Sequence, residues 1–193
     1  ICETLTLHFP LKKMYPNQNF RGNVLVKNIV SNSYEGKNSC VMFSGGVDAF
    51  NTLITHINEK PDIVTIYGAD IELTDQKGIY NVNKHHQDTA DKLKLNYHAI
   101  YSNCRTSINY NNLNNYVEEK LNCEWWHDFQ HGLALIGLTV PLSYVEKYSK
   151  VYIASSFTKE DIGNYTCASD PTIDNYFKHS SAITIHDGFE YDR

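Results

Sequence analysis

Apolar residues occur along this chain in short runs. The stretches between these runs have a different periodicity. Five runs have the length of a buried strand: 40–43 (CVMF), 62–67 (DIVTIY), 97–101 (YHAIY), 150–154 (KVYIA) and 182–186 (AITIH). The spacing of apolar residues between them predicts helices over 48–58, 74–93, 109–121 and 128–148. Connections of this length allow parallel strands joined by right-handed crossovers. The pattern therefore predicts an α/β layered fold.

The first residues follow a different pattern. TLTLHF (4–9) and NVLVKNIV (23–30) have the character of short strands, and the segment between them contains Pro and Gly. We predict an appendage over 1–37, which can be the end of a preceding domain, and one main domain over 38–193. Because the chain starts at Ile1 rather than methionine, we expect it to be a piece of a longer protein. The main domain can itself be truncated in this piece.

Composition narrows the class of protein. A chain of 193 residues, of which 41% are hydrophobic, is long enough for one well-buried core. The net charge of -5 is spread along the chain, and no stripe rich in Lys and Arg is present to follow a phosphate backbone. Long nucleic acid is therefore a disfavoured partner.

Cysteine usage and hydropathy indicate the compartment. The cysteines are Cys2, Cys40, Cys104, Cys123 and Cys167. Their odd number and the lack of a C-x-x-C pair fit neither a disulfide framework nor a zinc knuckle. No run of about 18 apolar residues and no basic-then-apolar leader occurs. We expect a soluble, cytoplasmic protein with no membrane partner.

The stretch CVMFSGGVDAFNTLITH (40–56) carries the clearest motif. It predicts a strand, a tight turn and a helix in quick succession. The free N–H groups and the dipole at the start of such a helix favour an anion. Gly45 and Gly46 can adopt positive φ, and the Ser44 hydroxyl adds a donor. The turn is thus suited to phosphate, although it matches neither the Walker loop nor G-x-G-x-x-G; an ordinary tight turn is the alternative.

FSGGVDAF (43–50) after an apolar strand resembles the S-G-G-x-D-S loop of the PP-loop ATP pyrophosphatases, the adenine nucleotide α-hydrolase-like superfamily. The resemblance extends over 40–186. It implies a Rossmann-like, open, mainly parallel five-stranded sheet in the order 3-2-1-4-5, with helices on both faces. It also implies that the pyrophosphate of ATP is bound at Ser44, Gly45, Gly46, Val47 and Asp48. Where the family pattern ends in Ser, this chain has Ala49, so one hydroxyl is absent.

The implied strand order places ligands above the carboxyl ends of the strands beside the first one. Ser155, Ser156 and Thr158 then lie across from the turn, where their hydroxyls can bind the nucleotide or the activated substrate. Hydroxyls that merely cap a loop are the alternative. The backbone of Tyr67 and Gly68 would meet the adenine.

Three charged residues complete the implied site. Asp70 can reach a ribose hydroxyl, or it is a solvated loop carboxylate. Asp48 can cap the helix, hold a Mg²⁺ ion that bridges the ATP phosphates, or do both. Arg105, in SNCRTS after the third strand, suits a phosphate or a substrate carboxylate, unless it is a surface arginine without a role. We assign catalytic roles to Asp48, Arg105 and His131.

CEWWHDFQHGLALIGL (123–138) is the second informative stretch. His127 and His131 have the i, i+4 spacing of metal-binding helices. The Glu of H-E-x-x-H is replaced by Asp128 and a third ligand is hard to name, which favours a substrate contact or a buried hydrogen-bonded pair over zinc. We expect both histidines to face the site without a tightly held metal, and Trp125 and Trp126 to wall a pocket or the core.

The resemblance implies an AMP-forming enzyme. It would use ATP and Mg²⁺ to adenylate a small-molecule substrate, with release of pyrophosphate, before amidation or ligation. A nucleotide-binding module that does not catalyse is one alternative, which Ala49 and the lack of an evident catalytic lysine support. A tRNA-thiolating sulfurtransferase is another, for which only Cys104 and Cys167 lie near the site. The acceptor, the donor and the oligomeric state, a homo-oligomer included, stay open.

Overall fold

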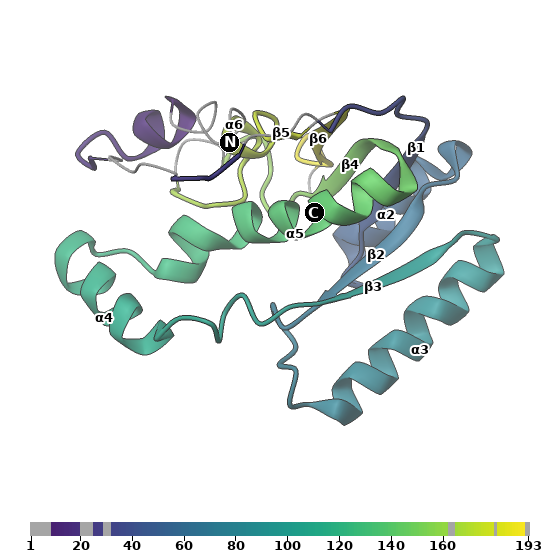
Figure 1. Cartoon of the computed structure of the whole chain (residues 1–193), viewed down its shortest axis with the longest axis horizontal. Helices are drawn as coiled ribbons and strands as arrows, with labels where there is room; N and C mark the ends of the chain where they lie inside the picture. Colours follow the sequence, from purple (N-terminus) through teal and green to yellow (C-terminus); the bar gives the residue numbers. More distant parts are fainter. Residues whose placement is uncertain (1–8, 20–24, 29–31, 162–164, 180, 192–193) are drawn as a thin grey trace.

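The computed structural model describes residues 9–19, 25–28, 32–161, 165–179 and 181–191 (Figure 1). The strands are β1 (Asn38–Met42), β2 (Asp62–Tyr67), β3 (Tyr97–Tyr101), β4 (Tyr148–Ala154), β5 (Lys178–His179) and β6 (Ala182–Asp187). The helices are α2 (Val47–Thr55), α3 (Gln76–Leu93), α4 (Tyr110–Leu121), α5 (His131–Glu146) and α6 (Pro171–Asp174), with a 3₁₀ turn η1 (Ile57–Glu59) and a π-helix η2 (Trp125–Gln130). The predicted α/β class is confirmed.

The strands form one mixed sheet in the order β3-β2-β1-β4-β6-β5. The pairs from β3 to β6 are parallel, and β5 pairs antiparallel with β6. This arrangement differs from the predicted five-stranded order 3-2-1-4-5, because β5 adds a sixth strand at the edge. A strand of two residues is too short to show alternation in the sequence. It arises from the hairpin that it forms with β6.

Two predicted segments, the helix over 128–148 and the N-terminal strands, differ from the structure. The predicted helix over 128–148 is divided, since η2 precedes α5 and the helix ends before β4. Of the predicted N-terminal strands, 4–8, 23–24 and 29–30 lie outside the described residues, whereas 9–14 are helical and 25–28 form no strand. Tyr15 stacks on Phe129 of η2, with ring centroids 4.7 Å apart. Tyr15 therefore packs its part of the N-terminal segment against η2.

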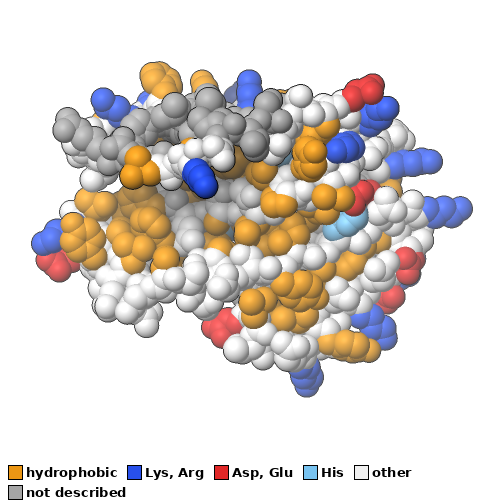
Figure 2. All heavy atoms as spheres, in the orientation of Figure 1, with side chains coloured by type: hydrophobic (Ala, Val, Ile, Leu, Met, Phe, Trp, Pro, Cys, Tyr) orange, Lys and Arg blue, Asp and Glu red, His pale blue; other side chains and the backbone are white. Residues whose placement is uncertain are grey.

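On the face seen in Figure 2, Lys and Arg side chains lie scattered rather than in one stripe. None of the described helices is long and apolar enough to cross a bilayer.

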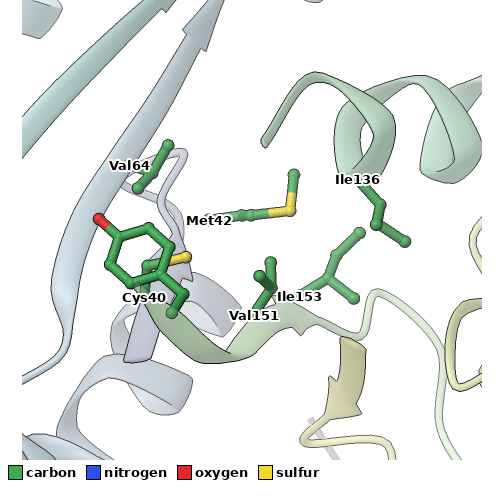
Figure 3. Close-up of a cluster of buried hydrophobic side chains, with 7 residues drawn as sticks. Cys40, Met42, Val64, Ile136, Val151 and Ile153 are labelled. Carbon is green, nitrogen blue, oxygen red and sulfur yellow. The ribbon is translucent and has the colours of Figure 1, made fainter. Parts of the chain in front are cut away.

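The core lies on both faces of the sheet because successive β-residues point to opposite sides. Met42 of β1 packs with Ile153 of β4 under Ile136 of α5, and Figure 3 shows these three side chains directed toward one another. On the other face, Val41 packs with Leu53 of α2. The sheet is thus covered by α5 on one side and by α2 and α3 on the other. This sandwich fixes the starts of α2 and α5 relative to the strand ends.

Candidate functional site

A pocket of about 450 Å³ lies at the carboxyl ends of β1, β2 and β4. Its lining is mainly apolar, with several polar side chains among the apolar ones. The polar side chains and the turn residues that line it are Ser44, Gly46, Asp48, Thr65, Asp70, His86, His127, His131, Ser156 and Ser169. Of the predicted site residues, Ser44, Gly46, Asp48, Asp70, His131 and Ser156 therefore meet at one cavity.

The two glycines of the turn differ in what the backbone requires. Gly45 has φ +80°, and a Cβ at this position would lie 2.7 Å from Nε2 of His86. The fold itself therefore requires glycine there. Gly46 has φ -77° and ψ 169°, an extended conformation that any residue adopts. A Cβ on Gly46 would contact only the Ser44 hydroxyl oxygen, at 3.5 Å. The described chain gives no steric reason for glycine at position 46.

The turn leads directly into α2, whose first turn lies at the pocket. Gly46 is the N-cap residue, and it has no side chain that could cap the helix. Asp48 lies in the first helical turn and lines the pocket, so its carboxylate is at the start of the helix, as the sequence predicts. Val47 is 84% exposed and is not among the residues that line the pocket. A helix start beside a cavity is suited to an anion.

His86 of α3 supports the turn from below. Its Nδ1 lies 2.7 Å from the Thr65 hydroxyl oxygen, and that hydroxyl is 3.1 Å from the carbonyl oxygen of Phe43. Burial lowers the pKa of His86 to about 4, so the ring is neutral at neutral pH. The sequence analysis missed this residue. It continues the buried stripe of α3 between Ile79 and Ala90, and a polar residue on such a stripe is a usable signal.

His127 and His131 form part of the opposite wall, and both line the pocket, as expected from their spacing. Burial lowers the pKa of His131, while the Asp70 carboxylate acts in the opposite direction. The His131 ring packs against Trp126, with centroids 5.2 Å apart. Trp126 is buried, in agreement with the predicted wall or core role. The pocket thus places an imidazole near a carboxylate.

Arg105 lies outside the pocket lining, in contrast to its predicted catalytic position. Its guanidinium donates a hydrogen bond to the carbonyl oxygen of Ala69 at 3.1 Å. It also lies over the rings of Trp126 and Tyr110, at 4.4 Å and 4.9 Å from their centroids. Arg105 therefore contacts the 69–71 loop, which lines the pocket.

Tyr67 and Gly68, predicted to meet adenine, do not line the pocket. Tyr67 is fully buried, and its hydroxyl lies 3.2 Å from that of Tyr97. Gly68 has φ +91°, and a Cβ there would be 1.8 Å from the carbonyl oxygen of Ser102. This glycine serves the close approach of two loops. Ala69 and Asp70 lie at the cavity instead.

The hydroxyl-bearing residues that follow β4 differ in whether they line the pocket. Ser156 lines the pocket, whereas Ser155 and Thr158 do not. The Ser155 hydroxyl donates to the carbonyl oxygen of Phe157 at 2.6 Å, and Thr158 bonds the Asp161 carboxylate through its N–H and its hydroxyl. Ser155 and Thr158 therefore match the loop-capping alternative.

A loop that the sequence analysis did not assign, 167–169, closes the pocket near the start of α5. The Ser169 hydroxyl donates to the Asp174 carboxylate at 3.0 Å, and His186 Nδ1 lies 2.8 Å from the same oxygen. Gly132 lets this loop approach, since a Cβ there would lie 2.4 Å from the carbonyl oxygen of Ala168. Burial raises the pKa of the Cys167 thiol to about 11, so it is not a thiolate at neutral pH.

Comparison with protein-family models, with curated proteins and with solved structures finds no match to this chain. The function is therefore argued from the pocket itself.

Proposed function

We propose that this chain is an ATP-binding protein of the PP-loop type, which adenylates a small-molecule substrate and releases pyrophosphate before an amidation or ligation step. The substrate oxygen would attack the α-phosphate of ATP, and pyrophosphate would leave into the 44–48 turn. The same proposal includes a Rossmann-like fold and a cytoplasmic location. It also includes assembly into a homo-oligomer.

The observation that carries the proposal is the glycine at position 46. It is the N-cap residue of α2, beside the pocket, in a conformation that does not require glycine. A ligand that approaches the backbone closely would explain why a side chain is absent there. The helix dipole and the N–H groups of the first turn favour an anionic ligand, such as a phosphate.

The other pocket residues suit the remaining parts of such a ligand. Asp48 supplies a carboxylate that would hold Mg²⁺ beside the phosphates. The apolar part of the lining, which includes Met42 and Leu135, offers surface for an apolar or planar group. Asp70 and His131 can orient a polar group and accept a proton from it. Catalysis would then rest mainly on positioning and charge neutralisation.

One observation favours the module that binds but does not catalyse. Ala49 is 2% exposed and packs in the core beside Val41 while it also lines the pocket. Its methyl group offers no hydroxyl to the phosphates. The sulfurtransferase alternative has less support, because Cys104 does not line the pocket and the Cys167 thiol stays protonated.

Calorimetric titration with ATP, followed by assay of AMP release in the presence of candidate acceptors, tests the proposal. We expect one ATP per chain in the presence of Mg²⁺, and AMP release that depends on an acceptor. ATP binding with no AMP release from a wide acceptor panel would favour the non-catalytic module. A chain that binds no ATP would refute both functions.

Asp48→Asn is expected to weaken ATP binding by about tenfold in the presence of Mg²⁺, because the metal loses a charged ligand. Without Mg²⁺ the affinity should stay equal or rise, since the substitution removes a negative charge near the phosphates. Titrations with and without Mg²⁺ measure the difference. An equal loss under both conditions would show that Asp48 acts without the metal.

A further inference from the structure

A second cluster of ligating side chains lies at the amino ends of the strands, whereas the pocket lies at their carboxyl ends. Asp62 is the first residue of β2, His98 is near the start of β3, and Glu146 is the last residue of α5. One donor atom from each residue lies within 4.8 Å of the other two. Among the described residues, this is the group of three that is close enough to hold one metal ion.

Asp62 is held in place by residues around it. The Asn96 amide donates to Oδ1 at 2.9 Å, and the Tyr148 hydroxyl donates to Oδ2 at 2.8 Å. Asp62 is also buried. Each carboxylate oxygen can accept more than one bond, so both keep capacity for a metal. Outer hydrogen bonds of this kind orient metal-binding carboxylates in proteins.

The charge at the cluster favours a cation. Two carboxylates lie close together, and no Lys or Arg of the described residues is paired with Asp62 or Glu146. His98 Nε2 lies 3.1 Å from Oδ2 of Asp62. A divalent ion between these atoms would replace this contact, and the neutral imidazole would then carry its proton on Nδ1.

We propose that Asp62, His98 and Glu146 form a binding site for a divalent transition-metal ion of the zinc type. One imidazole and two carboxylates are a donor set that Zn²⁺ accepts, with a water molecule in the fourth position. Three ligands, one of them nitrogen, are a poor match to Ca²⁺, which takes six to eight oxygens. The ion would connect the starts of β2 and β3 to the end of α5.

The site is separate from the ATP pocket. Asp62 lies at one end of β2, and Thr65 and Ile66 near its other end line the pocket. The metal proposal therefore does not depend on the proposed ATP chemistry. It also differs from zinc binding at His127 and His131, which lie on the pocket wall.

Titration of the chelator-treated chain with Zn²⁺ alone tests the site. We expect one Zn²⁺ per chain, a raised melting temperature on addition of the ion, and a tetrahedral-type absorption spectrum with Co²⁺. His98→Gln should weaken zinc binding by about 100-fold or more, and Glu146→Gln by at least about tenfold. Circular dichroism would check that both variants are folded.

Two control variants make the result specific. His85→Gln removes an exposed histidine of α3 and should leave zinc affinity unchanged. The double variant His127→Gln/His131→Gln should also keep the site. The proposal is overturned by a wild-type chain that binds no Zn²⁺, by stoichiometric zinc that survives His98→Gln, or by zinc that is lost only in the double variant.

Discussion

Gly46→Val is expected to lower ATP affinity by about 100-fold while the free energy of unfolding changes by about 1 kcal/mol or less. Position 46 is extended, and among the described residues beyond its two chain neighbours a Cβ would meet the Ser44 hydroxyl oxygen alone. The backbone conformation and the space at the Cβ position therefore permit a side chain here. A phosphate lying against the backbone would not, because the side chain would occupy its place. Calorimetric titration of ATP and denaturant unfolding measure the two quantities.

Two further glycine variants separate binding from folding. Gly45→Ala should lower stability markedly, since it combines positive φ with a contact of 2.7 Å to His86. Gly137→Ala in α5, where the nearest atom would be 4.0 Å from the new Cβ, should leave both folding and ATP binding intact. Unchanged ATP affinity in a folded Gly46→Val variant would mean that the turn holds no phosphate.

The five longer strands were predictable because each contains an apolar run. The bounds of β2 and β3 agree with the predicted runs over 62–67 and 97–101. β5 was not predicted, because its two residues become a strand only through pairing with β6. Local pattern therefore identifies buried strands well, whereas a short edge strand depends on tertiary contact.

The start of α5 shows a second limit of the sequence. The backbone carbonyl of His127 accepts a hydrogen bond from the N–H of Ala168, far along the chain. This contact lies within the π-helical turn 125–130, which the helical pattern did not predict. Small changes of helix register of this kind often occur at functional sites. Apolar periodicity cannot indicate a turn that involves a distant loop.

The candidate site was predictable only in part. The 44–48 turn was found because strand, glycines and helix follow one another in the sequence. Arg105 was assigned to catalysis from its place after a strand, but its guanidinium bonds the Ala69 carbonyl oxygen and lies over Trp126. Ser169 was missed because it follows no strand and enters the pocket through the packing at Gly132. Loop side chains take their positions from contacts that a sequence pattern does not contain.

The buried His86 is expected to make the fold sensitive to mild acid. The histidine pKa is about 6.5 in an unfolded chain, and burial lowers the pKa of His86 to about 4 in the fold. Between these pH values the unfolded chain binds a proton that the folded chain does not. The free energy of unfolding therefore falls as the pH is lowered, by about 3 kcal/mol between pH 6.5 and 4. Above pH 6.5 this contribution is fully present.

His86→Asn should remove most of this slope while it keeps a hydrogen-bonding group near the Thr65 hydroxyl. Denaturant unfolding at several pH values measures the slope, so a lower overall stability of the variant does not affect the comparison. His85→Gln removes the neighbouring charge but not the buried ring, and most of the slope should persist. Equal slopes in the wild type and His86→Asn would show that this ring is not held neutral. Because His86 supports the turn at Gly45, protonation is also expected to weaken ATP binding over the same pH range, once the acid titration of ATP itself is subtracted.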